Sequence, residues 1–336
     1  MELVNDTPLP SALVPTTSGD GEILMLVLSA ITLDLRGSGP VLADAQDPLR
    51  IASDPVFPND AQLLREGVAV CATGHLYPST PGGSEGRAVL GIGDLKREVL
   101  GFGPRVWAEG TLGSAPSATS PRPFDRVPMR WENAFGGSAE EPARMIEKDG
   151  ERYLAPAFQR HEGNNPLGKG YYATAKAAVD QPLPQLEHPT DRITSWEDRP
   201  EPVCFAPYPL FGALRAAFLK DGKNIQLDRL PRITGKSAPR TTFGVIPPGT
   251  EIALGGMRPG GRRITFRTPV APVSIHVLVG SVEKTVTPAL DAIDIDADAE
   301  RVRLLFRAGF RYPLVAGELR RATIAASESF PPAQRG

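Results

Sequence analysis

The sequence predicts a mainly β protein, built as an antiparallel sandwich or barrel-like sheets with long ordered Pro/Gly-rich loops and one or two short helices. Its 34 glycines and 35 prolines each make up about a tenth of the 336 residues, which is too much for a helical bundle. The hydrophobic fraction of 41% is too high for a disordered chain. Short apolar segments recur at a spacing of roughly 8–12 residues, which favours a sandwich or barrel over βαβ units.

One β-rich domain is expected to occupy nearly the whole chain. We expect an irregular N-terminal segment (1–19), the domain itself (20–325) and a flexible tail (326–336). Two strand-rich sub-lobes are possible within the domain, residues 20–125 and 241–325, joined by the loop-rich residues 126–240.

The first sub-lobe begins with the most apolar run of the chain. Residues 23–28 predict a strand covered on both faces, and residues 31–35 a strand covered on one. Further short strands of an antiparallel meander are expected at 67–77, 88–93, 98–101 and 105–108.

The middle of the chain has little regular pattern. Residues 140–148 predict two helical turns, and residues 212–220 predict the best short helix. The rest is rich in proline, but it carries too many aromatic residues for a free linker. An ordered loop packed on the sheets is therefore expected.

Strand signals return after residue 240, separated by the turn signals Pro-Pro-Gly at 247–249 and Pro-Gly-Gly at 259–261. The expected strands are 241–246, 251–254, 263–267, 273–279, 284–287, 290–295 and 302–306.

Composition and charge narrow the possible partners and compartment. The net charge of −2 argues against a general nucleic-acid binder. The longest apolar run is shorter than the roughly 20 residues of a membrane helix, and residues 1–11 lack the basic start of a secretory signal. A soluble, cytoplasmic protein with no nucleic-acid or membrane partner is expected. Cys71 and Cys204 are then expected to be buried free thiols rather than a disulfide.

Two glycine- and amide-rich stretches, residues 128–137 and 164–172, stand out as fixed irregular loops. Glycine permits positive φ and close backbone approach, and proline restricts the turns. Trp131 and Phe135 are expected to anchor the first loop in the core. Glu132, Asn133 and Asn165 are expected to tie its backbone turns, so that the loops fix a surface that a partner meets.

Three motifs resemble catalytic or metal sites but lack a required element. Residues 163–169 have P-loop spacing of glycine and lysine, but Gly170 stands where Ser or Thr would bind magnesium. Residues 82–86 match G-x-S-x-G, but prolines precede them, which favours a hairpin tip. Residues 294–298 begin like a calcium loop and then lack its glycine and final glutamate. No catalytic residue, cofactor or metal is expected.

A glycan-active or glycan-binding protein remains an alternative. It would use Glu132 and Glu187 as paired carboxylates, with Trp131 and Trp196 as stacking surfaces. A structural tie through the carboxylates is the competing interpretation. A structural subunit without a client is a further alternative.

Residues 220–267 carry ten basic and three acidic residues, in a chain that is acidic overall. A solvated face is one interpretation, and docking onto an acidic partner is the other. The possible docking patch comprises Arg229, Arg232, Lys236, Arg240, Arg258, Arg262 and Arg263.

The order of several motifs resembles a bacterial domain family of unknown function that is typically encoded beside type VI secretion spike (VgrG) proteins and their effectors. The resemblance covers roughly residues 20–325 and is strongest at Pro-Met-Arg-Trp-Glu-Asn-Ala-Phe-Gly-Gly (128–137), Asn-Pro-Leu-Gly-Lys-Gly (165–170) and Leu-Pro-Gln-Leu-Glu (183–187). The motif residues carried over are Trp131, Glu132, Asn133, Phe135, Gly136, Gly137, Asn165, Pro166, Gly168, Gly170 and Glu187.

The resemblance implies a non-catalytic adaptor or chaperone. Such a protein would bind a secreted effector and help to load it onto the VgrG spike, with the effector and the spike as its partners. The glycan-binding and structural-subunit alternatives stay open at this point.

Overall fold

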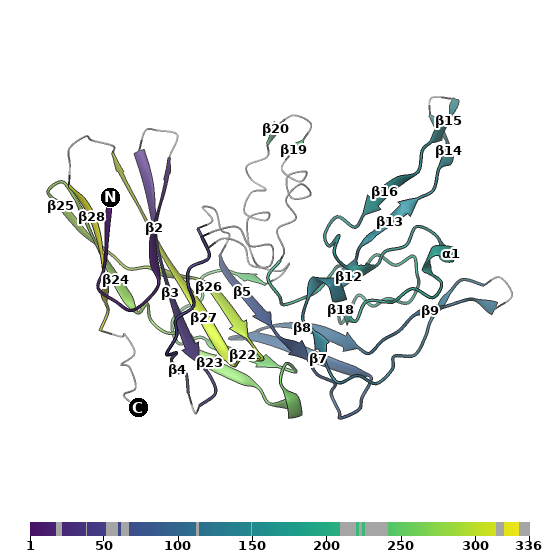
Figure 1. The fold of residues 1–336 in the computed structure, drawn as a ribbon, viewed down its shortest axis with the longest axis horizontal. Helices are drawn as coiled ribbons and strands as arrows, with labels where there is room; N and C mark the ends of the chain where they lie inside the picture. The colour runs from purple at the N-terminus through teal and green to yellow at the C-terminus, as the bar shows by residue number, and fades with distance from the viewer. Residues whose placement is uncertain are drawn as a thin grey trace.

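The computed structural model describes eleven segments of the chain, and it is mainly β, as predicted (Figure 1). They are residues 1–17, 22–37, 39–51, 60–61, 67–111, 114–148, 150–208, 220–221, 224–225, 241–313 and 319–328. Within these segments, no helix is long and apolar enough to cross a membrane.

A seven-stranded sheet forms the centre of the molecule. Its order is β2 (Ser11–Thr17), β3 (Glu22–Asp34), β27 (Arg301–Pro313), β26 (Ala289–Asp296), β5 (Val68–Thr73) and β21 (Thr242–Phe243), with β4 (Val41–Leu42) also paired to β3. Neighbours are antiparallel except β26 and β5, which run parallel. The two runs predicted at 23–28 and 31–35 form one strand, and its side chains are buried on both faces because Ser29 and Thr32 are buried as well.

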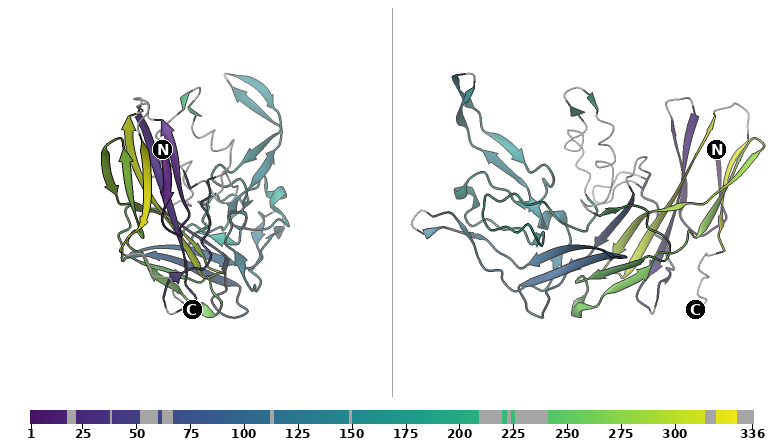
Figure 2. Two further views of the ribbon diagram at one scale, coloured as in Figure 1. Left: turned by 60° about the vertical axis from the view of Figure 1, so that its left-hand side comes forward. Right: turned by 180° about the vertical axis from the view of Figure 1, so that it is seen from behind.

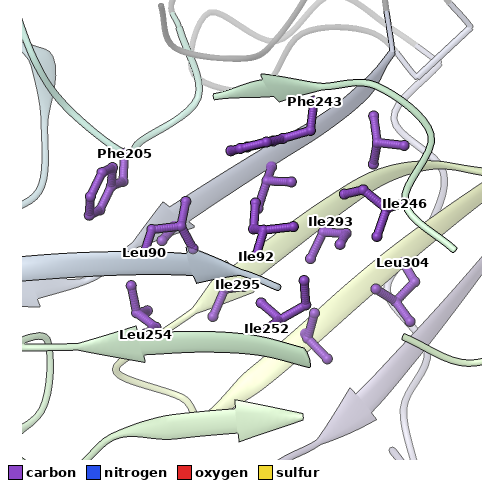
Figure 3. Packing of buried hydrophobic residues seen from close by; sticks show 14 of the residues in the cluster. Leu90, Ile92, Phe205, Phe243, Ile246, Ile252, Leu254, Ile293, Ile295 and Leu304 are labelled. Carbon is purple, nitrogen blue, oxygen red and sulfur yellow. The ribbon is translucent and has the colours of Figure 1, made fainter. Parts of the chain in front are cut away.

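A five-stranded sheet packs against the central one. Its order is β18 (Leu186–Glu187), β8 (Leu95–Phe102), β7 (Glu85–Ile92), β22 (Glu251–Gly255) and β23 (Ile264–Arg267). The two sheets share one core, in which branched side chains of β7 and β22 meet those of β26 and β27 (Figure 3). Ile252, Ile293 and Leu304 are fully buried there. Strands from both halves of the sequence therefore contribute to each of these two sheets.

A third sheet, of four strands, lies at the end of the molecule that carries the N-terminus (Figures 1 and 2). Its order is β1 (Glu2–Asn5), β28 (Arg320–Ala326), β24 (Val273–Val279) and β25 (Val282–Val286). The prediction of an irregular segment 1–19 is wrong for its described residues, because β1 pairs in parallel with β28 and β2 pairs with β3. Leu9, between them, is 1% exposed.

The predicted flexible tail begins inside the third sheet. Ala326 is the last residue of β28, and the backbone N–H of Ser327 donates to Pro272 O at 2.9 Å. The flexible-tail prediction is therefore wrong for its first residues, because strand pairing and this hydrogen bond hold them. Residues 329–336 lie outside the described residues.

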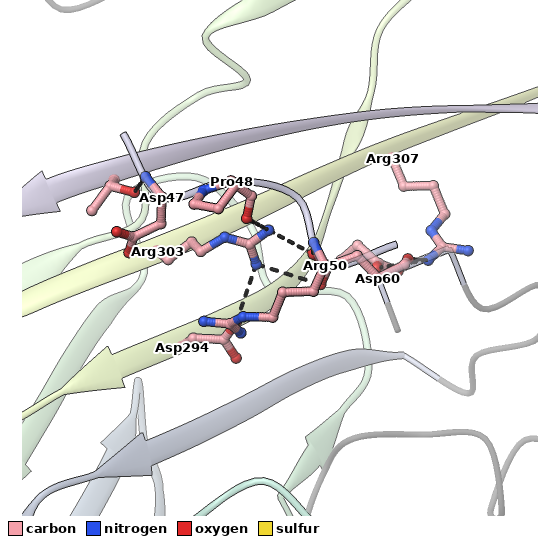
Figure 4. Close-up of polar contacts among 9 residues, drawn as sticks. Asp47, Pro48, Arg50, Asp60, Asp294, Arg303 and Arg307 are labelled. Carbon is pink, nitrogen blue, oxygen red and sulfur yellow. Dashed lines mark hydrogen bonds and ion pairs between the residues drawn. The ribbon is translucent and has the colours of Figure 1, made fainter. Parts of the chain in front are cut away.

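Buried ion pairs fasten the segment after β4 onto the seven-stranded sheet (Figure 4). Arg303 on β27 is 2% exposed and donates to Asp60 at 2.6 Å and to Asp294 at 3.3 Å. Its burial lowers the pKa of the guanidinium, but the carboxylates of Asp60 and Asp294 outweigh that effect, so the pKa lies above its usual value. Arg50 donates to the same Asp294 oxygen at 3.2 Å. Each of these charges thus has an opposite charge close to it, which buried charges require.

The helix predicted at 140–148 is wrong, because the residues form strands of a projecting arm (Figures 1 and 2). The arm pairs β13 (Ser138–Glu141) with β16 (Phe158–His161), and β14 (Arg144–Lys148) with β15 (Glu151–Ala155). Pro142 stands within the predicted helix, where it would remove a helical hydrogen bond. An oppositely charged cross-strand pair, Glu147 with Arg152, supports the antiparallel register instead.

The helix predicted at 212–220 lies outside the described residues apart from Lys220, which begins the two-residue strand β19 (Lys220–Asp221) paired with β20 (Asn224–Ile225). The described α-helix is α1 (Ala175–Ala178), whose first turn is capped by the Thr174 side chain. Short pairs complete the fold: β6 (His75–Leu76) with β11 (Val127–Pro128), β9 (Trp107–Ala108) with β10 (Ser117–Ala118), and β12 (Phe135–Gly136) with β17 (Lys169–Gly170).

Candidate interaction site

The two glycine-rich stretches meet through strand pairing and through one buried amide. β12 and β17 pair in parallel, with Phe135 opposite Lys169 and Gly136 opposite Gly170. Asn165 has no exposed surface, and its Nδ2 donates to Trp131 O and Phe135 O, each at 2.8 Å. Its backbone O accepts from the N–H of Gly137, also at 2.8 Å. The hydrogen bonds of Asn165 therefore add to this short strand pair in linking the two loops.

Glycines make this close approach possible. A Cβ at Gly136, where φ is +146°, would lie 1.9 Å from Asn165 O. A Cβ at Gly168 would lie 2.5 Å from Asn165 Nδ2 and 2.7 Å from Ala134 O. No side chain fits at either position without moving the backbone. The glycines of the motif thus serve the packing of one loop on the other.

Two aromatic residues of the motif are buried in different hydrophobic clusters. Trp131 belongs to the main core, and its Nε1–H donates to Ala206 O and Pro207 O at 3.1 Å. The ring of Tyr208 contacts it edge to face, with centroids 4.8 Å apart. Phe135 packs in a second cluster that includes Trp107, Tyr171 and Leu183. The motif therefore bridges the main core and a smaller one.

The polar residues of the motif mostly hold its own backbone. Asn133 Nδ2 donates to Pro128 O at 2.9 Å, while Asn133 Oδ1 accepts from Lys169 Nζ at 3.2 Å. Burial lowers the pKa of Lys169, and the negative charge of Glu132 partly opposes that shift. Glu132 is exposed, and Pro166 and Gly168 are half-buried. Residues 163–168 form a loop that leads directly into β17, so the helix start that a phosphate site needs is not at this position.

Glu187 lies inside the protein. It is 3% exposed; Oε1 accepts from Arg105, and Oε2 accepts from Arg192 Nε at 2.9 Å and from the Ile193 N–H at 3.3 Å. Both guanidinium groups also stack over the Phe102 ring, at 4.3 and 4.5 Å from its centroid. Both carboxylate oxygens of Glu187 thus hold structural partners.

The four residues of the glycan-binding alternative occupy different environments. Trp131 and Glu187 are buried, Trp196 is half-buried against the second cluster, and Glu132 is exposed. An exposed carboxylate and a carboxylate held between two arginines do not make the pair flanking a sugar that this alternative requires.

An open groove of about 570 Å³ lies against the motif. Its buried lining residues are apolar and include Met129, Trp131, Ala206 and Pro207. Its exposed lining residues are mostly charged: Arg130, Glu132, Asp296 and Asp298, together with Leu167 and Ala299. His75 Nδ1 lies 2.7 Å from Asp298 Oδ2 at the same rim.

Of the residues that line this groove, only Trp131 and Glu132 are among the site residues that the sequence predicts. The lining residues, 73–75, 128–132, 167, 206–207, 296 and 298–299, come from five separate parts of the chain, and no spacing in the sequence joins them. In the sequence, Asp296 and Asp298 belong to the incomplete calcium loop and carry no site prediction. Among the residues that the structure describes, no cluster of His, Cys, Asp or Glu could hold a metal ion.

The predicted basic patch is only partly described. Arg258 and Arg262 both pair with Glu300, Arg262 at 2.5 Å, and Arg263 is exposed. Arg229, Arg232, Lys236 and Arg240 lie outside the described residues. Two of the three described members therefore bind their own chain.

Cys71 and Cys204 are buried free thiols, as predicted. Burial raises the pKa of the Cys204 thiol far above its usual range, so the group stays protonated.

Residues 20–307 match the model of the family described as "uncharacterized protein conserved in bacteria (DUF2169)". The chain belongs to this family. The matched region of this DUF2169 member contains both glycine-rich stretches and every residue that lines the groove. No curated protein and no solved structure matches the chain.

Proposed function

We propose that this DUF2169 protein is a cytoplasmic, non-catalytic adaptor or chaperone that binds a type VI secretion effector and assists its loading onto the VgrG spike. The proposal rests on the sequence resemblance and on two surface features of the structure, an arm and a groove. A rigid β body carries an arm and a groove that lie on its surface, and both suit contact with another protein.

The arm is the observation that favours protein binding most. Five large apolar side chains are exposed on it: Met145 (59%), Ile146 (39%), Tyr153 (47%), Leu154 (66%) and Phe158 (50%). An isolated two-stranded hairpin is marginally stable in water, and clustered exposed apolar side chains mark interaction surfaces. The arm is therefore suited to become buried when a partner binds.

The strand register distributes these side chains over both faces of the arm. Met145 is opposite Leu154, and Ile146 is opposite Tyr153, so the two pairs point to opposite faces. One flat surface can cover only one of these pairs. A partner that encloses the hairpin would bury both, as expected for a chaperone and the protein that it holds.

The contacts of the motif favour a structural role over a catalytic one. Asn165, Trp131 and Glu187 are buried, and each makes hydrogen bonds to its own chain. Trp131 lines the groove, and Asn165 holds its backbone in place.

The test is co-expression with the proteins encoded by neighbouring genes, followed by affinity purification and size-exclusion chromatography. We expect one stable complex with a neighbouring toxic effector. The absence of a complex with any neighbour-encoded protein would contradict the proposal, whereas specific glycan binding by the purified protein would favour the lectin alternative.

A further inference from the structure

We infer that the groove beside the motif binds a cationic segment of the partner protein, through lysine or arginine side chains. This inference rests on the proposed function, because it names the chemistry that the partner presents. It concerns the groove lined by residues 73–75, 128–132, 167, 206–207, 296 and 298–299, called the motif groove below.

The charges at the rim favour a positive occupant. Glu132, Asp296 and Asp298 are exposed there, against a single arginine, Arg130. The side chain of Asp298 is 41% exposed even though one oxygen contacts His75. Three carboxylates around a concave surface focus a negative potential, which attracts cations and repels anions.

The partners of the acidic side chains leave room for a further contact. Asp296 accepts the Ala299 N–H through Oδ1 at 2.9 Å, and Asp298 contacts His75 through Oδ2. A carboxylate accepts several hydrogen bonds, so both groups retain capacity toward a guanidinium or ammonium group. Arg258 lies behind this turn and donates to the backbone oxygens of Ala297 and Asp298, so it holds the turn in place.

The apolar floor of the groove indicates that the bound side chains also have an apolar part. Met129, Trp131 and Pro207 are buried and form an apolar surface below the charged rim. Lysine and arginine side chains match this arrangement, because their aliphatic stems cover apolar surface while their charged ends reach polar groups. A volume of about 570 Å³ accommodates a few such side chains of an extended segment rather than a folded domain.

A pair of peptides tests the inference directly. The probes are fluorescein-labelled, amidated Ala-Arg-Leu-Arg-Ala and Ala-Glu-Leu-Glu-Ala, measured by fluorescence anisotropy with the full-length protein at low salt. We expect the arginine peptide to bind at least about tenfold more tightly and to weaken as salt is added. Equal binding of the two peptides would overturn the inference.

Matched variants locate the binding. Asp296→Asn with Asp298→Asn should weaken the arginine peptide by about tenfold, since each charge-assisted hydrogen bond is among the stronger kinds. The control, Asp94→Asn with Glu283→Gln, makes the same change in net charge at exposed sites outside the groove and should bind as the wild type does. If both double variants bind alike, the groove is not the site.

Two further variants keep the test decisive if the first one folds poorly. Glu132→Gln changes an exposed rim residue and should weaken the arginine peptide as well. Asp296→Lys with Asp298→Lys should reverse the preference and favour the glutamate peptide. Unchanged preference in both variants, with melting temperatures near that of the wild type, would overturn the inference.

The same variants separate this inference from the proposed function. A partner that co-purifies with the wild type but not with Asp296→Asn/Asp298→Asn supports the motif groove as its recognition site. A partner that binds both equally overturns the inference and leaves the adaptor function standing. If no partner is found, the adaptor function fails, and the peptide experiment still decides the chemistry of the groove.

Discussion

Asn165 is the residue on which the geometry of the motif depends most. It has no exposed surface and joins the loop after Trp131 to the loop before β17 with two side-chain hydrogen bonds. The glycines beside it leave the space that these bonds need. Packing requires an asparagine and glycines at these positions, so we expect their replacement to lower the free energy of unfolding.

Gly136→Ala tests this packing, and a control variant measures the cost of positive φ without a close neighbour. The control is Gly249→Ala, because Gly249 also has positive φ (+82°) but nothing within 4 Å of an added Cβ. We expect Gly249→Ala to cost about 1–2 kcal/mol of unfolding free energy. Gly136→Ala should cost about 1–3 kcal/mol more, since its Cβ would overlap Asn165 O. Urea unfolding measures both, and equal losses would show that the close approach is not needed.

Glu187→Gln tests whether Glu187 is structural. Removal of its charge leaves Arg105, 7% exposed, without its opposite charge, so we expect a loss of about 3–5 kcal/mol in unfolding free energy. Glu98→Gln is the matched control on neighbouring β8, in a partly exposed pair with Arg87, and should cost about 0–1 kcal/mol. A fully stable Glu187→Gln protein with lost ligand binding would instead favour a functional carboxylate.

At the scale of elements, the arm can be changed without affecting the stability of the body. Its side chains between residues 144 and 147 are exposed, and its apolar pairs touch neither of the two hydrophobic clusters that the motif joins. Substitutions there should therefore leave the fold intact while changing the surface that a partner meets.

Met145→Ser with Leu154→Ser removes one cross-strand apolar pair from the arm. Because both side chains are exposed, we expect the unfolding free energy to change by no more than about 0.5 kcal/mol per substitution. Thermal unfolding followed by circular dichroism checks this. A large fall in melting temperature would mean that the arm packs on the body, contrary to its position in the structure.

Strands with a self-contained pattern were predictable from the sequence, and elements defined by their partners were not. β24 occupies the predicted residues 273–279, because buried apolar residues alternate there with more exposed ones. The sequence predicts a helix in the arm because the strand register there depends on residues 151–155, whose pairing no local pattern reveals. β1 was missed for the same reason, since its parallel partner β28 lies more than 300 residues away.

The candidate site also has a part that the local sequence predicts and a part that it does not. The glycine and amide content of residues 128–137 and 164–172 predicted fixed loops, and strand pairing brings the two loops together. The acidic rim of the groove could not be predicted, because Asp296 and Asp298 reach it from the end of β26 through the fold of the central sheet. Local chemistry was visible in the sequence, whereas the surface formed by distant segments was not.

At the scale of the whole molecule, three sheets form a body whose strands come from both halves of the chain. The motif lies between the central sheets and the arm (Figure 1), so one continuous scaffold supports both the groove and the arm. Such an arrangement suits a protein that holds another protein in a defined orientation. The account therefore predicts that changes in the arm weaken partner binding while the body stays folded.

The most direct test is co-purification of the neighbour-encoded effector with the wild type and with Met145→Ser/Leu154→Ser. The control is Leu95→Ser, which removes an exposed apolar side chain from β8, outside the arm. We expect the wild type and the Leu95→Ser protein to form a stable complex with the effector, and the arm variant to lose it at an unchanged melting temperature. Equal recovery of the effector with all three proteins, or no complex with any of them, would contradict the account.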